Sequence, residues 1–197
     1  MTEPPLRGLA TRIESSGPAI ELDVIDTRLL IELAKDARIP QRKLAEMLGM
    51  SSPAVADRIA RLKNRGVIRG FSVDIDWDRL GNSTVAYLSI VAAMGQDQNS
   101  VIEQLVKVRG VEEISVVTGS TDMLVKIRAR GFDDLRTILA TDIWNIEGVQ
   151  KTETSISLIR VEPDGITERM LNSMPSHGQQ EPTPRLSIRD HEVKPKS

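Results

Sequence analysis

The sequence predicts an α+β protein in which an N-terminal three-helix helix–turn–helix domain is followed by a ferredoxin-like βαββαβ sandwich domain. Two short amphipathic helical patterns flank a tight turn between residues 36 and 69. Further along, the order strand, helix, Gly-Val, strand occurs twice between residues 84 and 161. Charge divides at the same boundary, because residues 38–69 are rich in arginine and lysine whereas acids outnumber bases over residues 70–162.

These patterns divide the chain into five segments. The first is rich in Pro and Gly, and the last is rich in Pro, Ser, Gln and charge, so neither is expected to fold stably. The predicted segments are a flexible arm (1–20), the helix–turn–helix domain with a following strand (21–75), a hinge (76–82), the sandwich (83–163) and a disordered tail (164–197).

Three helices are predicted in the first domain. The first begins at about Asp23, and the second begins at Pro40 and ends at Gly49, a residue suited to a left-handed cap. The third has Ser52 as N-cap, followed by Pro53. The residues expected to be buried recur at helical spacing: Leu22, Ile25, Leu29 and Leu33, then Leu44, Met47 and Leu48, then Val55, Ile59 and Leu62.

The third helix carries a second stripe, one residue's rotation from the apolar one. Its members are Ala54, Arg58, Arg61 and Arg65. A recognition helix has this arrangement, with one side packed on the domain and the neighbouring side in the major groove. The same pattern also fits a helical hairpin whose charged face is merely solvated. The predicted DNA-binding residues are Arg42, Lys43, Ser51, Ser52, Ala54, Arg58, Arg61, Lys63 and Arg65. Arg58 is the first choice for a base contact, with Lys63 and Arg65 placed on phosphates.

A strand is expected over Val67–Ile75, and the sandwich follows the hinge. Its predicted strands are Thr84–Val91, 111–118, Met123–Ala129 and 149–161. Val101, Leu105 and Val108 mark one helix of the repeat, and Phe132, Leu135, Ile138 and Leu139 mark the other. One sheet face carries the helices, and with only 3% aromatic residues the other offers no stacking platform for RNA. A partner subunit is the expected cover.

Composition argues against catalysis. The chain has no cysteine, and both histidines lie in the predicted tail, so no catalytic residue, metal site or cofactor is expected. No apolar run could span a bilayer and the N-terminus lacks the apolar centre of a secretion signal, so a cytoplasmic protein without membrane contact is expected.

The order of motifs resembles the Lrp/AsnC family of regulators. The matching pieces are LDVIDTRLLIEL, ARIPQRKLAEMLGMSSPAVADRIARLKNRGVIRGF, DRLG, VTGSTDML, IEGV and TETSISL. The resemblance implies a transcriptional regulator of amino-acid metabolism or transport genes that binds double-stranded DNA. It also implies dimers formed through the sheets, assembly into octamers or similar discs, and tuning by a free amino acid bound where dimers meet.

In that family the effector cleft contains a glycine–aspartate turn. The matching residues here are Thr118, Gly119, Ser120 and Asp122, joined by Thr152 and Thr154 of the last strand. A carboxylate such as Asp122 can hold an ammonium group, while hydroxyls and backbone N–H groups can hold a carboxylate. By themselves the same residues are typical of an ordinary β-turn.

Two other functions stay open. One is an architectural, nucleoid-type DNA-binding protein that ignores small molecules. The other is a regulatory subunit of an amino-acid-handling enzyme, which the basic head and the missing catalytic residues disfavour.

Overall fold

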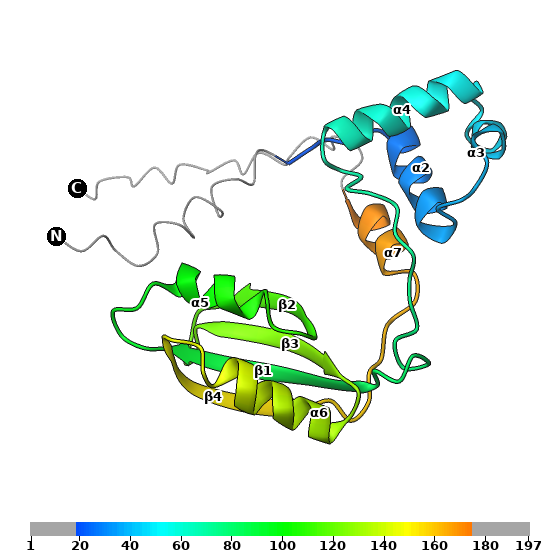
Figure 1. The fold of residues 1–197 in the computed structure, drawn as a ribbon. Helices are drawn as coiled ribbons and strands as arrows, with labels where there is room; N and C mark the ends of the chain where they lie inside the picture. Colours follow the sequence, from blue (N-terminus) through cyan, green and yellow to red (C-terminus); the bar gives the residue numbers. More distant parts are fainter. Residues whose placement is uncertain (1–18, 175–197) are drawn as a thin grey trace, which may run out of the picture. The chain divides into compact units, whose positions relative to one another are not determined.

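The computed structural model describes residues 19–174 (Figure 1). They form two compact units, a helical unit of residues 20–71 with 163–174 and a sandwich unit of residues 72–162. The arm predicted for residues 1–20 lies almost wholly outside the described part, as do residues 175–197 of the predicted tail. No helix among the described residues is long and apolar enough to cross a membrane.

Three helices build the core of the helical unit: α2 (Val24–Lys35), α3 (Gln41–Leu48) and α4 (Ser52–Asn64). Asp23 caps α2, accepting a hydrogen bond from the backbone N–H of Asp26. Gly49 ends α3 in the left-handed conformation, with φ 66°, as the sequence predicts. The core consists of the buried side chains of Leu29, Leu33, Leu44, Ala45, Leu48, Val55 and Leu62.

Two local predictions in this unit are wrong. The N-cap of α4 is Ser51 rather than Ser52, because the Ser51 hydroxyl accepts from the backbone N–H of Ala54. Pro53 therefore sits one residue further into the first turn. Met47 is exposed, and Ala45 takes the buried place on α3 instead.

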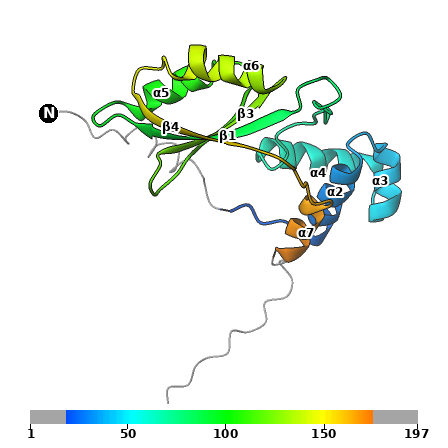
Figure 2. The ribbon, with the colours of Figure 1, turned by 90° about the horizontal axis from the view of Figure 1, so that it is seen from below.

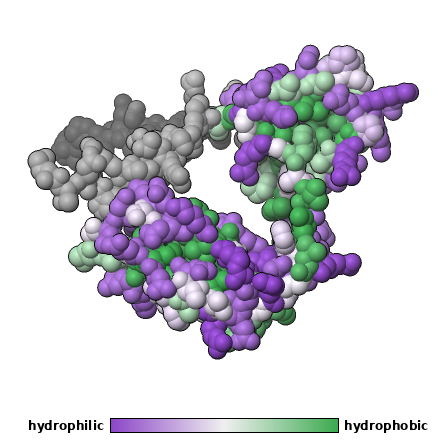
Figure 3. All heavy atoms as spheres, in the orientation of Figure 1, coloured by the Kyte–Doolittle hydropathy of each residue, from purple (hydrophilic) through white to green (hydrophobic). Residues whose placement is uncertain are grey.

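Residues 67–75 form no strand, contrary to prediction. Within the described residues this segment has no strand beside it to complete a ladder, so its backbone stays irregular. Its apolar side chains Phe71, Val73 and Ile75 are exposed. Figure 3 shows apolar atoms at the surface along the connecting segments.

The sandwich unit confirms the predicted ferredoxin-like topology. Its elements are β1 (Thr84–Ala92), α5 (Gln98–Leu105), β2 (Val111–Val116), β3 (Met123–Ala129), α6 (Phe132–Thr137) and β4 (Val149–Ile156). The antiparallel sheet has the order β2-β3-β1-β4, the order that two split βαβ units produce. Figure 2 shows α5 and α6 on the same face of this sheet. Helix α6 continues as a π-helix, Ile138–Ile143, which the sequence does not predict.

The helix-covered face of the sheet holds the core of this unit. Leu88 and Ile90 of β1 pair with Val125 and Met123 of β3, and all four are fully buried. The neighbouring residues along each strand point to the opposite face. That open face includes the half-exposed side chains of Tyr87 and Leu124. Phe132, one of the apolar residues that mark this helix in the sequence, is exposed at the start of α6.

The last helix, α7 (Ile166–Ser173), lies where the sequence predicts a disordered tail. It belongs to the helical unit, where it packs against α2. Lys35 Nζ lies 3.6 Å from Glu168 Oε1 across this contact. The segment is amphipathic but short, and its stability comes from that packing more than from intrinsic propensity.

Candidate functional site

The surface of α4 is the first candidate. Its N-terminal turn presents Ser51 and Pro53 to solvent, with Ser52 and Ala54 partly covered. Asp57 follows on the exposed side, so this first half of the helix is not basic. The positive side chains lie further along α4 and on α3.

An ion-pair cluster joins α4 to α2. Arg58 Nη1 donates to Asp23 Oδ2 and to Asp26 Oδ1, each at 2.6 Å. Arg61 Nη2 donates to both oxygens of Asp26, at 3.0 and 2.9 Å. Asp26 is only 2% exposed, and these guanidinium groups supply the partners that a buried carboxylate requires.

The pKa values of Asp23 and Arg58 move in the direction expected of a stabilising pair. Partial burial alone would raise the pKa of the Asp23 carboxyl, but hydrogen bonds from Arg58 and from the Asp26 backbone N–H outweigh it. The pKa of Asp23 is therefore held below its ordinary value. The hydrogen bond to Asp23, together with that to Asp26, raises the pKa of Arg58.

This geometry argues against Arg58 as the leading base contact. Its side chain is 19% exposed and its guanidinium is held between two carboxylates of α2. Because Arg58 and Arg61 face α2, the arginine stripe seen in the sequence is in part an internal contact. Arg61 is half-exposed, so it can still reach a phosphate while paired with Asp26.

The other predicted basic residues are open to solvent. Lys43 and Arg65 are exposed, and neither makes an ion pair within residues 19–174. Arg42 is exposed and pairs with Glu46 along α3, at 3.2 Å. Lys63 Nζ lies 5.8 Å from the centre of the Phe71 ring. These four exposed cationic side chains are of the kind that contacts phosphates.

The second candidate is the turn between β2 and β3. Thr118, Gly119 and Ser120 are exposed, and Gly119 has φ 131°, a conformation that glycine adopts easily. Thr121 Oγ1 donates to the Ile90 carbonyl at 2.8 Å, and Asp122 N donates to the same carbonyl at 2.9 Å. The turn is therefore fixed to β1.

Asp122 already has a structural role in this turn. Its Oδ2 accepts from the backbone N–H of Ala92 at 2.8 Å. Pairing between β1 and β4 shifts register between Val91 and Ala92, and pairing between β1 and β3 ends at Ile90. The carboxylate continues the ladder where β3 stops. Within the described residues Oδ1 takes no hydrogen bond, so one oxygen of Asp122 is left for an ammonium group.

Thr152 and Thr154 lie on the far side of β1 from this turn. They pair with Ile90 and Leu88, so their side chains point towards the helix-covered face. Thr152 Oγ1 accepts from Trp144 Nε1 at 3.1 Å. Ile90 thus separates Thr152 from Asp122, and one chain does not bring the six predicted effector residues into a single pocket.

The sequence interpretation missed Asp23 and Asp26 as functional positions. A signal for Asp26 was present, since it follows Leu22 by four residues and precedes Leu29 by three, on the buried stripe of α2. A charge at such a position must be paired. The arginines at matching helical spacing on α4 were the available partners.

Comparisons with known proteins cover both units. Residues 22–69 match the winged helix-turn-helix DNA-binding family, and residues 86–166 match the Lrp/AsnC ligand binding domain. The chain is 34% identical over 139 residues to the HTH-type transcriptional regulator FL11 of Pyrococcus abyssi, covering 71% of this chain and 91% of the relative. Identity to the regulatory protein AsnC of Haemophilus influenzae is 31% over 137 residues, covering 70% of this chain and 91% of the relative. The solved structure of E. coli AsnC superposes with a TM-score of 0.72 at 27% identity, over 75% of this chain and 99% of that one.

Proposed function

The chain belongs to the Lrp/AsnC family of DNA-binding transcriptional regulators, and from that premise we propose that it controls amino-acid metabolism or transport genes in response to an amino acid. The observation that carries the proposal is the joining of two units in one chain, a basic helical head and a ligand-binding sandwich of AsnC type. A regulator acting on the chromosome works in the cytoplasm.

For DNA contact we propose that α4 enters the major groove, with its exposed N-terminal turn nearest the bases. Ser51 and Ser52 supply hydroxyls there, and Ala54 leaves room for a thymine methyl group. Lys43, Arg61 and Arg65 then lie on the phosphates. Arg58 orients α4 through α2, so its contribution is to the position of the helix.

For the effector we propose an amino acid whose ammonium group pairs with Asp122 Oδ1. Its carboxylate meets the hydroxyls of Thr118 and Ser120 and the open backbone at Gly119. A single chain leaves this turn exposed to solvent. Closure by a neighbouring copy explains how such an open turn could retain a small ligand.

Assembly into homodimers, and of dimers into octamers, fits the exposed apolar groups. Tyr87 and Leu124 lie on the uncovered sheet face, and Val73, Leu158 and Ile159 lie on the connecting segments. Contiguous exposed apolar surface marks an interaction site in soluble proteins, and these side chains would supply it. A dimer would also present two recognition helices to two half-sites.

The test is DNA binding on the gene's own upstream sequence, measured by anisotropy and footprinting with and without each amino acid. An effector should change affinity about fivefold or more, which is the usual range of allosteric coupling. Asp122→Asn keeps an acceptor for the Ala92 N–H but removes the charge, so it should bind DNA normally and lose the response. Gly119→Val, which places a branched side chain in a positive-φ turn, should lose the response as well.

A result in which no amino acid changes DNA affinity would refute the effector proposal and favour an architectural DNA-binding role. If an amino acid binds wild type and Asp122→Asn equally tightly in calorimetry, the effector site lies elsewhere. A monomer in light scattering at micromolar concentration would refute the assembly.

A further inference from the structure

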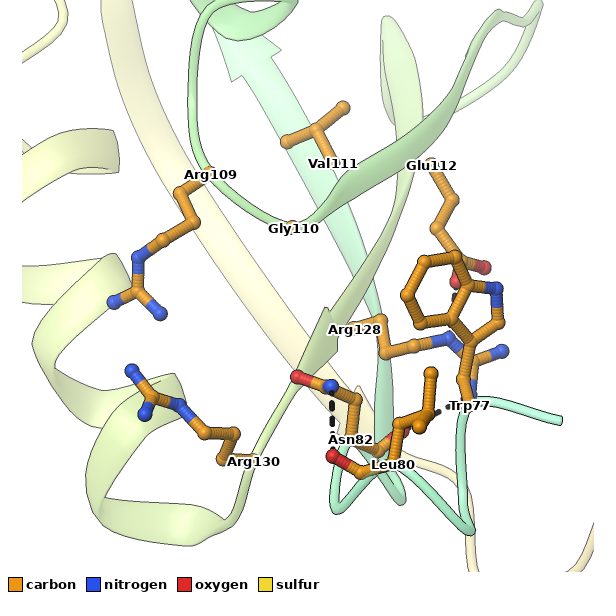
Figure 4. A pocket seen from close by; sticks show the side chains of 9 residues that line it. All are labelled: Trp77, Leu80, Asn82, Arg109, Gly110, Val111, Glu112, Arg128 and Arg130. Atoms are coloured by element: carbon orange, nitrogen blue, oxygen red, sulfur yellow. Dashed lines mark hydrogen bonds and ion pairs between the residues drawn. The ribbon is translucent and has the colours of Figure 1, made fainter. Parts of the chain in front are cut away.

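The sandwich unit contains a hollow of about 540 Å³ at the end of the sheet away from the Gly119 turn. Figure 4 shows its lining: Trp77 and Leu80 come from the turn before β1, Arg109 from the loop before β2, and Arg128 and Arg130 from the end of β3. Strand β3 has seven residues, so roughly 20 Å separates this hollow from the Gly119 turn. Its volume lies within the range of small-molecule sites, about 300–1,000 Å³.

The floor of the hollow is a fixed network around Arg128. This side chain is 10% exposed and pairs with Glu112 through Nε. Its Nη1 donates to the Asn82 carbonyl at 3.1 Å and to Asp78 Oδ1 at 3.3 Å. Hydrogen bonds to the Trp77 carbonyl from the backbone N–H groups of Leu80 and Asn82 fix the turn itself, so Trp77 stands on a defined support.

One wall carries excess positive charge. Figure 4 shows the guanidinium groups of Arg109 and Arg130 pointing towards each other. Both share one carboxylate, Asp134, whose oxygens lie 2.9 Å from Arg109 Nη1 and 3.9 Å from Arg130 Nε. Each guanidinium has five N–H donors, so most of them are left for a ligand. Two cations against one anion leave a charge that a single negative group would balance.

The opposite wall is apolar. The Trp77 indole and the Leu80 side chain are both partly open to the hollow, and Figure 4 shows the indole across from the two arginines. An indole face binds a flat ring by offset stacking. A carboxylate suits the other wall, because it matches the guanidinium fork and carries the single charge required, whereas a doubly charged phosphate would exceed it.

We propose that this hollow is a second small-molecule site, for a monoanionic aromatic carboxylate. Its ring lies against Trp77, and its carboxylate bridges Arg109 and Arg130. The turn that it contacts is continuous along the chain with residues 72–76, which lead out of the helical unit, so occupancy can influence that connection. The two sites are separate in ligand class and in lining residues.

Benzoate is the probe for this site, and Trp77 is the reporter. The chain has two tryptophans, Trp77 and Trp144, so Trp144→Phe leaves Trp77 as the only indole. In full-length Trp144→Phe, benzoate should change Trp77 emission saturably at millimolar concentration or below. Benzamide, which keeps the ring without the charge, and acetate, which keeps the charge without the ring, should each bind at least about tenfold more weakly.

Substitution of the two wall arginines tests whether benzoate binds in this hollow and not elsewhere on the protein. Arg109→Gln with Arg130→Gln should weaken benzoate at least about tenfold, equivalent to about 1.4 kcal/mol. The matched control is Arg136→Gln, because Arg136 is exposed and pairs with Asp133 outside the hollow. Calorimetry on the same variants with both tryptophans present gives a reading independent of fluorescence.

Equal affinity for benzoate and benzamide would overturn the proposal, as would unchanged benzoate binding in the double variant or no saturable binding at millimolar benzoate. Asp122→Asn should bind benzoate as wild type does. The aromatic-carboxylate site and the amino-acid site can therefore fail independently of each other.

Discussion

Replacing Asp26 with Asn tests the ion-pair cluster that joins α2 to α4. The Asp26 carboxylate is buried and accepts from both Arg58 and Arg61. Removing one partner of a fully buried pair costs about 3–5 kcal/mol. Arg58 keeps Asp23, Arg61 is half-exposed, and Asn retains one acceptor, so we expect a loss of about 2 kcal/mol in the free energy of unfolding. For a domain of this size that loss lowers Tm by roughly 10 °C.

Two signals follow the two units separately in the full-length protein. Both tryptophans, Trp77 and Trp144, lie in the sandwich unit, so their emission reports its unfolding. Circular dichroism at the helical band is weighted towards the helical unit. Asp26→Asn should lower the Tm measured by circular dichroism at the helical band. The Tm measured by tryptophan emission should stay unchanged.

Asp57→Asn is the matched control, since Asp57 is exposed on α4 and loses the same charge. We expect its helical transition to match that of wild type. If the helical transitions of Asp26→Asn and Asp57→Asn have the same Tm, the Asp26 ion pairs contribute no stability. Arg58 would then be free to act as a base contact.

Three further predictions concern acid, glycine and salt. The pKa of Asp23 is lowered from its ordinary 3.8, so the stability it provides is complete above pH 3.8 and is lost as pH falls through the depressed pKa. In acid unfolding monitored by circular dichroism, Asp23→Asn should lose less stability than wild type as the pH falls. Gly110→Ala should cost more than the about 1–2 kcal/mol expected for positive φ alone, because its Cβ would lie 2.2 Å from the Arg128 carbonyl oxygen. The control is Gly95→Ala, at φ 85°, where an added Cβ would have nothing within 4 Å. In denaturant titration its free energy of unfolding should fall only by the cost of the positive φ. Arg65→Ala should lower the affinity for all DNA sequences evenly. It should also reduce the slope of log affinity against log salt concentration by about one unit.

Much of the fold was predictable because it depends on local pattern. The apolar spacing of α2 and α4, the left-handed cap at Gly49 and the repeated Gly-Val pairs each specify an element without reference to distant residues. The strand β3 was predicted with its observed bounds, because apolar and polar residues alternate from Val125 to Ala129.

The failures depend on partners far away in the chain. The apolar alternation of residues 67–75 predicts a strand. Within the described residues, however, no other strand lies beside this segment to pair with it. Arg58 has the spacing of a groove-facing residue, yet the carboxylates that hold it are 32 and 35 residues earlier. The hollow beside Trp77 combines three segments of the chain, and no single stretch of sequence contains its pattern.

The packing of α7 on α2 means that the chain returns to the helical unit after it has formed the sandwich. The helical unit is assembled from both sides of the sandwich, so in topological terms the sandwich is an insertion within the DNA-binding head. Within residues 20–174, two covalent crossings join the units, at residues 71–72 and 162–163. If a protease cut only one crossing, the two pieces would still share the contact between α7 and α2. Trimming the chain before Ile166 would remove a piece of the head itself.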